Sequence, residues 1–151
     1  RSGIDCLSFG LTKNGGIAAE AVVMFDQALA EQFAFRRKRA GHLWSKQRFL
    51  AAQWLALLKD DLWLSNARHA NAMAQRLAAG FNAHPGIELP WPVDANELFP
   101  VIPDHTRVQL REAGLEFYDW PAQSNMTRFV THFATDPEDI ERALKIIEST
   151  M

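Results

Sequence analysis

The residue best suited to covalent chemistry is Lys13, which lies in the turn Thr12-Lys13-Asn14-Gly15-Gly16. A lysine in an Asn-Gly turn ordinarily does no more than face solvent. A chemical role would require burial, because desolvation lowers the pKa of an amine and only the neutral amine attacks a carbonyl. The turn by itself leaves both interpretations open.

A second candidate is Arg128, within the stretch Met126–Phe133. Alternation along this stretch predicts a strand that places Arg128, Val130 and His132 on one face. A guanidinium presents a planar fork of donors, which suits bidentate binding of a carboxylate better than an ammonium group does. An ion pair at a strand edge is the alternative interpretation of this arginine.

Common catalytic and cofactor templates are missing from the sequence. It has no glycine-rich phosphate loop of the Rossmann or Walker type, no His/Cys cluster at zinc spacing and no serine in a G-x-S-x-G elbow. The five histidines are dispersed. These features argue against a hydrolase, and we expect no metal site.

The first half of the chain predicts a hairpin followed by helices. Two apolar stretches flank the lysine turn and predict strands over Ile4–Phe9 and Ala21–Phe25. Helices are predicted over residues 27–39 with Asp26 as N-cap, over residues 46–59, and from Asp60 or Asp61 towards Gly80.

The last third alternates strand and helix. Strands are predicted over residues 87–89, 97–102, 115–120 and 126–133, and a helix over residues 104–113. Thr135-Asp136-Pro137-Glu138 predicts a capping box that starts a final helix. Short connections favour a mainly antiparallel small sheet with helices on one side.

The composition indicates a packed chain. Of its 151 residues, 48% are hydrophobic and 23% are charged, which excludes a disordered or collagen-like protein. The single cysteine, Cys6, can form no internal disulfide, so we expect a cytoplasmic location. No apolar run is long enough to span a bilayer. The sequence starts at Arg1 without a Met, and we expect a cut or truncated chain.

Positive charge gathers in one block. Residues 36–48 contain six cations and no acid, namely Arg36, Arg37, Lys38, Arg39, Lys46 and Arg48. Such a block can bind nucleic acid, a membrane surface or a phosphorylated small molecule. Cations in a last helical turn also complement the helix dipole, so a solvated helix end is the ordinary interpretation.

The segment Asp5–Gly15 resembles the pyridoxal-phosphate attachment site of the low-specificity L-threonine aldolases, in the β-eliminating-lyase branch of the fold-type I enzymes. The resemblance continues through Ala19–Phe25, Phe35–Gly41, Ala67–Asn71 and Thr127–His132 and covers essentially the whole chain. It implies an α/β fold that is the C-terminal part of such an enzyme. Residues 1–45 would end the cofactor-binding large domain, and residues 46–151 would form linking helices and a small α+β domain.

The resemblance also implies roles for individual residues. Lys13 would form the Schiff base with pyridoxal 5'-phosphate, and Arg128 would bind the carboxylate of the substrate. Lys38 matches a basic residue near the cofactor phosphate, commonly contributed across a subunit interface. Lys46 would replace an arginine that some members have in the following loop.

The implied activity is retro-aldol cleavage of L-threonine or L-allo-threonine to glycine and acetaldehyde. The ring-stacking histidine, the acid paired with the pyridine nitrogen and much of the phosphate cradle would lie upstream of Arg1. We therefore expect the chain alone to be inactive, with the missing N-terminal segment and further copies, as a dimer or tetramer, as its partners.

Two alternatives remain open from the sequence. The substrate could be another β-hydroxy amino acid such as phenylserine, or the reaction could be β-elimination instead of retro-aldol cleavage. The chain could instead be a non-catalytic interaction module whose block of cations at residues 36–48 meets an anionic partner. On the enzyme interpretation we expect neither nucleic acid nor a membrane as partner.

Overall fold

The chain divides into two compact units, Arg1–Leu64 (unit 1) and Ser65–Met151 (unit 2). The computed structural model describes residues 2–120 and 125–150. The sequence-based domain division between residues 45 and 46 follows the family resemblance rather than contacts within the chain, and it stays a prediction. Within the described residues, no helix has both the length and the apolar character needed to cross a membrane.

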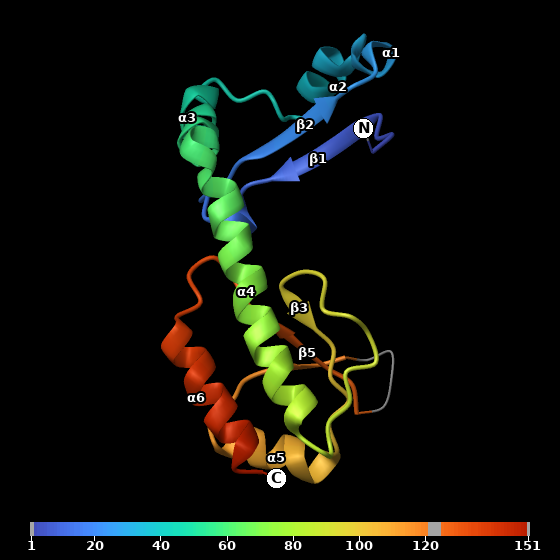
Figure 1. Ribbon diagram of the computed structural model, residues 1–151. Coiled ribbons are helices and arrows are strands. Elements are labelled where there is room, and N and C mark those ends of the chain that lie inside the picture. Colours follow the sequence, from blue (N-terminus) through green and yellow to red (C-terminus); the bar gives the residue numbers. More distant parts are fainter. Residues whose placement is uncertain (1, 121–124, 151) are drawn as a thin grey trace. The chain divides into compact units, whose positions relative to one another are not determined.

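Unit 1 begins with the predicted hairpin. Strands β1 (Cys6–Gly10) and β2 (Glu20–Met24) pair antiparallel, with Cys6 opposite Met24 and Gly10 opposite Glu20 (Figure 1). A short 3-10 helix, η1 (Thr12–Asn14), forms the first part of their connection. Both predicted strands are therefore confirmed: β1 begins two residues later and ends one residue later than predicted, and β2 lies one residue earlier.

Two short helices follow β2 where the sequence predicted one. The Asp26 carboxylate accepts a hydrogen bond from the Ala28 N–H, which confirms the predicted N-cap. The prediction of a single helix over residues 27–39 is wrong, because a turn at Glu31 and Gln32 separates α1 (Gln27–Ala30) from α2 (Phe33–Arg39). Both helices are almost wholly exposed, so little packing is available to stabilise one continuous helix.

The long helices of the chain follow the periodic apolar pattern. Helix α3 (Gln47–Leu58) ends within a residue of its predicted limits. A 3-10 turn, η2 (Lys59–Asp61), separates it from α4 (Leu62–Ala83). Asp60 and Asp61 have left-handed φ values of 52° and 56°. The predicted break between the two helices is therefore confirmed, and it results from the backbone conformation of these two residues. The core of unit 1 is small and consists of Leu11, Ala19 and Leu57, with Leu50, Trp54 and Trp63 packed against it.

Unit 2 packs helices on a three-stranded antiparallel sheet. The strand order is β3 (Glu97–Leu98), β5 (Thr127–Val130), β4 (Tyr118–Asp119), so β5 is central. Helices α5 (Asp104–Glu112) and α6 (Pro137–Glu148) complete the unit, with α6 beside α4 (Figure 1). One core joins all of them: Ala74, Leu77, Ala78, Phe81, Ile87, Leu98, Ile102, Leu110, Phe129, Ala143 and Ile147.

The strands of unit 2 are shorter than the sequence predicted. Residues 87–89 contribute only a bridge between Glu88 and Val101, and the strand predicted over residues 115–120 shortens to β4. Pro100 has no N–H for the ladder, which limits β3 to two residues. The capping box also differs: Asp136 caps α6 by accepting the Glu138 N–H, while the Thr135 hydroxyl accepts the His132 N–H.

Candidate active site

Lys13 lies on a turn that its own backbone holds closed. The carbonyl of Leu11 accepts hydrogen bonds from the N–H groups of Asn14 and Gly16, at 3.0 and 3.1 Å. The Leu11 N–H donates to the Ala19 carbonyl at 3.0 Å, and the Leu11 side chain is fully buried. Lys13 thus projects from a turn whose base is fixed in the core of unit 1.

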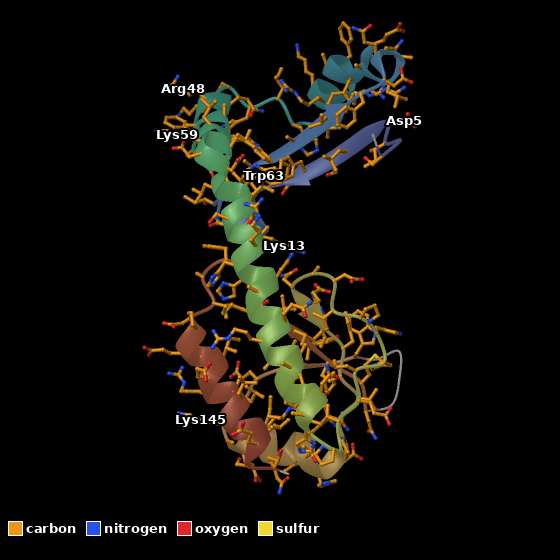
Figure 2. All side chains as sticks on the ribbon, viewed as in Figure 1. Asp5, Lys13, Arg48, Lys59, Trp63 and Lys145 are labelled. Carbon is orange, nitrogen blue, oxygen red and sulfur yellow. The ribbon has the colours of Figure 1, made fainter. Side chains whose placement is uncertain are left out.

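Side chains from two helices anchor the same turn. The amide nitrogen of Asn14 donates to the Trp63 carbonyl at 2.9 Å, and Gln53 Oε1 accepts from the N–H groups of Ile17 and Ala18 at 2.9 and 3.3 Å. In Figure 2, Lys13 and Trp63 lie at one end of the hairpin and Asp5 at the other. The sequence predicted the turn, but it gave no signal for Gln53, which acts across 35 residues or more.

Two glycines let the backbone close behind Lys13. Gly15 has a φ of 108°, a left-handed conformation that a side chain would strain. A β-carbon on Gly16 would lie 2.4 Å from Leu11 Cγ, too close for any real contact. The Gly15-Gly16 pair is therefore required by the shape of this turn.

The Lys13 side chain itself is exposed. The nearby hairpin residue Phe9 packs on Trp54 and Trp63, with ring centroids 4.7 and 5.5 Å apart. None of these ring contacts involves Lys13, which stays exposed. The burial that amine chemistry requires is thus absent from the described residues of unit 1.

Lys38 and Lys46, the predicted phosphate-binding cations, are also exposed. Lys38 lies in the last turn of α2, which follows the end of β2 remote from Lys13 (Figure 1). A five-residue strand measures about 16 Å, so Lys13 and Lys38 are not neighbours within a single copy of unit 1. Lys46 directly precedes α3, about 10 Å of helix rise before Gln53.

In unit 2, Arg128 lies on β5, the central strand of the sheet. Its neighbours Thr127, Phe129 and Thr131 are buried, as the predicted alternation requires. The Thr127 hydroxyl donates to the Pro100 carbonyl at 3.2 Å, and the Thr131 hydroxyl donates to the Ala70 carbonyl at 2.7 Å. The backbone on both sides of Arg128 is therefore tied to other elements.

The guanidinium of Arg128 pairs with Glu97, with 2.5 Å between Nη2 and Oε1. This hydrogen bond raises the pKa of Arg128 above its ordinary value and outweighs the partial burial that lowers it. The contribution of the pair is present below the ordinary pKa of arginine and is lost only as pH rises through the raised value. Sequence reasoning did not find Glu97, because its contact depends on how β3 pairs with β5.

An open groove of about 490 Å³ borders Arg128 in unit 2. Its lining includes Tyr118, Val130, Thr131 and Thr135. Residues from β4, β5 and α6 contribute to the lining. Within residues 2–120 and 125–150, no three His, Cys, Asp or Glu side chains are grouped to hold a metal ion.

The class of protein follows from a family model. The family described as Beta-eliminating lyase matches residues 1–104, and the chain belongs to this family. The particular proteins it is similar to are the low specificity L-threonine aldolases of Pseudomonas aeruginosa and of another Pseudomonas strain. Each is 40% identical over 151 residues, which is 100% of this chain and 43% of the relative. The chain thus spans less than half the length of these curated relatives.

Solved structures agree on the fold. The threonine aldolase of Leishmania major matches with a TM-score of 0.87 and 30% identity, over 96% of this chain and 43% of that one. A glycine decarboxylase (P-protein) of the glycine cleavage system matches with a TM-score of 0.56 and 20% identity, over 97% and 35%, and this likeness concerns the fold alone. The predicted resemblance to low-specificity aldolases and the fold-type I class are therefore confirmed.

Proposed function

We propose that this chain is the C-terminal part of a pyridoxal-phosphate-dependent L-threonine aldolase. The enzyme cleaves L-threonine or L-allo-threonine to glycine and acetaldehyde. The similarity of all 151 residues to two low specificity L-threonine aldolases carries the proposal. The anchored turn of Lys13 supports it, because a residue that forms a covalent bond to a cofactor must be presented in a fixed position.

The residues of this chain suit pyridoxal phosphate. The cofactor has an aldehyde, which a primary amine can bind, and a phosphate, which cations can bind. Lys13 offers the amine on a turn that is anchored in the core of unit 1, and Lys38 and Lys46 offer exposed cations. Lys38 lies beyond the far end of the hairpin, which supports the prediction that it serves the site of a neighbouring subunit.

When bound, pyridoxal phosphate supplies the electron sink that accepts the electrons of the breaking Cα–Cβ bond. Lys13 would hold the cofactor through its amine. Arg128 binds the substrate carboxylate and so fixes the orientation of the Cα–Cβ bond. The groups that stack on the ring and pair with its pyridine nitrogen would come from the segment upstream.

The active enzyme on this proposal is an oligomer, a dimer or tetramer, of chains that include the upstream segment. The apolar surface of unit 1 supports such an assembly. Four large apolar side chains are each about half exposed or more, namely Phe25, Phe35, Trp44 and Leu55. Such a set of exposed apolar side chains is typical of a surface that another chain segment or subunit covers. We call the assembled protein the full-length enzyme, and we expect the chain alone to be inactive.

Replacement of the lysine tests the proposed function. The full-length enzyme should release glycine from L-threonine and show the visible absorbance of bound pyridoxal phosphate. Lys13→Ala should abolish that absorbance and lower kcat by at least about 1000-fold, because the covalent step is lost. Lys59→Ala, an exposed lysine at the end of α3, is the matched control and should change neither. An unchanged absorbance in Lys13→Ala would rule out the assignment.

A bulkier substrate such as phenylserine is the second candidate. Tyr118 lies directly opposite Arg128 in the sheet, and its ring is 6.5 Å from that of Trp120, which is 5.1 Å from that of Phe99. These rings extend an apolar face beside the guanidinium, which would suit an aromatic side chain. A higher kcat/KM for phenylserine than for L-threonine, lost in Tyr118→Ala, would favour this candidate.

A further inference from the structure

Glu97 is the only hydrogen-bond partner of the Arg128 guanidinium within residues 2–120 and 125–150. The two residues are diagonal neighbours, because Glu97 pairs with Val130 and Leu98 with Phe129. Their side chains are 39% and 32% exposed, so the ion pair contributes little to the stability of the fold. The role of this ion pair therefore lies in its effect on the arginine side chain.

The burial of one nitrogen decides which edge of the guanidinium a ligand can use. Arg128 Nε has no exposed surface and no partner among the described residues. A carboxylate arriving from solvent cannot reach Nε, and it must bind the terminal nitrogens. Glu97 takes one of these with a single oxygen and leaves Nη1 open within the described part of the chain.

The contact also removes freedom from a long side chain. An arginine that is held at one terminal nitrogen has fewer rotamers to lose when a ligand binds. Tyr118 lies directly opposite Arg128 on β4, so the two side chains share one face of the sheet. Glu97 and the strand register thus determine together where the open edge of the guanidinium points.

We propose that Glu97 is a positioning residue, which holds Arg128 so that its open terminal edge receives the carboxylate of the amino acid substrate. The proposal rests on the proposed function, in which Arg128 binds that carboxylate. Glu97 does not touch the substrate. It acts through the guanidinium, so its removal should weaken binding of the carboxylate and leave the bond-breaking step largely intact.

Steady-state kinetics of the full-length enzyme with L-threonine provide the test. Glu97→Ala should raise KM about tenfold and change kcat less than about twofold, because a hydrogen bond to a charged group is lost. Glu97→Gln keeps an oxygen that accepts from Nη2, so its KM should stay within about threefold of the wild type. Glu112→Ala, an exposed carboxylate at the end of α5, is the matched control.

Two further measurements separate positioning from a general effect on structure. The affinity for glycine, followed by the cofactor absorbance, should fall in Glu97→Ala, while that for ethanolamine, which has no carboxylate, should not. In an Arg128→Ala background, Glu97→Ala should change KM by less than about a further twofold, because the guanidinium through which Glu97 acts is gone. If Glu97→Ala does not fold, Glu97→Met removes the acceptor while keeping the side-chain length.

The outcomes are distinct from those of the proposed function. A full-length wild-type enzyme without cofactor absorbance or glycine release would contradict the proposed function itself. With an active wild type, an unchanged KM in Glu97→Ala would overturn the positioning role. A lower KM would also overturn it, because Glu97 would then compete with the substrate for Arg128. An equal loss of ethanolamine affinity would reduce Glu97 to a structural residue.

Discussion

Gly16 is the single residue on which the shape of the Lys13 turn depends most directly. A β-carbon at this position would lie 2.4 Å from Leu11 Cγ and 2.5 Å from Cδ2. Leu11 is fully buried and has no room to retreat. We therefore expect Gly16→Ala to lower the free energy of unfolding by about 2 kcal/mol. Urea unfolding of the full-length enzyme measures the change.

Gly10 is the matched control in the same hairpin. The three atoms nearest to a β-carbon there all belong to the carboxylate of Glu20, an exposed side chain that can move. Gly10→Ala should therefore cost less than about 1 kcal/mol. Equal losses from both substitutions would show that the contact with Leu11 is not the reason Gly16 matters.

Single residues differ in how far the sequence alone predicts their place. The Lys13 turn was predictable because Asn-Gly-Gly signals a turn locally. The exposed face of Arg128 was predictable because side chains alternate along a strand. Glu97 was not, because it meets Arg128 only once β3 and β5 pair in one register, 31 residues apart. Local patterns determine a residue's face, whereas its partner depends on the fold.

At the scale of elements, Gln53 joins helix α3 to the Lys13 turn. Its side-chain oxygen accepts from the N–H groups of Ile17 and Ala18. We expect Gln53→Ala to release both, and to speed their amide hydrogen exchange about tenfold, because their exchange no longer requires opening of these bonds. Hydrogen exchange of the full-length enzyme, followed by NMR, measures the two amides.

Two other substitutions test this interpretation of α3. Gln53→Glu keeps an acceptor oxygen, so the exchange of both amides should stay near that of the wild type. Gln47 lies on the same helix and donates to the His42 carbonyl, away from the turn. Gln47→Ala should leave Ile17 and Ala18 unaffected. Faster exchange in both α3 variants would indicate general loosening of the helix rather than loss of one anchor.

Helices and strands were predicted well where the spacing of apolar residues repeats several times, and poorly where it does not. Helix α3 was predicted to within a residue because its apolar residues recur over three turns. The two-residue strands β3 and β4 could not be delimited, since so short a pattern does not distinguish a paired residue from an extended one. The break between α1 and α2 has no glycine or proline to signal it.

At the scale of the whole molecule, the two units differ in how complete their cores are. Unit 2 buries residues from three helices and from the sheet in one cluster. Among the described residues of unit 1, three are buried in its core, whereas many large hydrophobic side chains are exposed, among them Ile17, Phe25, Phe35 and Leu55. A two-stranded hairpin with so small a core is marginally stable unless other chain segments cover it.

This difference predicts how the two units respond to removal of the upstream segment. In the isolated chain, amides of β1 and β2 should exchange at least about 100-fold faster than in the full-length enzyme, since opening of the hairpin then costs little. Amides of β5 and α6 should change less than about tenfold, because their core lies within unit 2. Hydrogen exchange with mass spectrometry on both proteins makes the comparison. Equal protection of the hairpin in both would mean that unit 1 is complete by itself, and its apolar surface would then need an explanation other than cover by the rest of the enzyme.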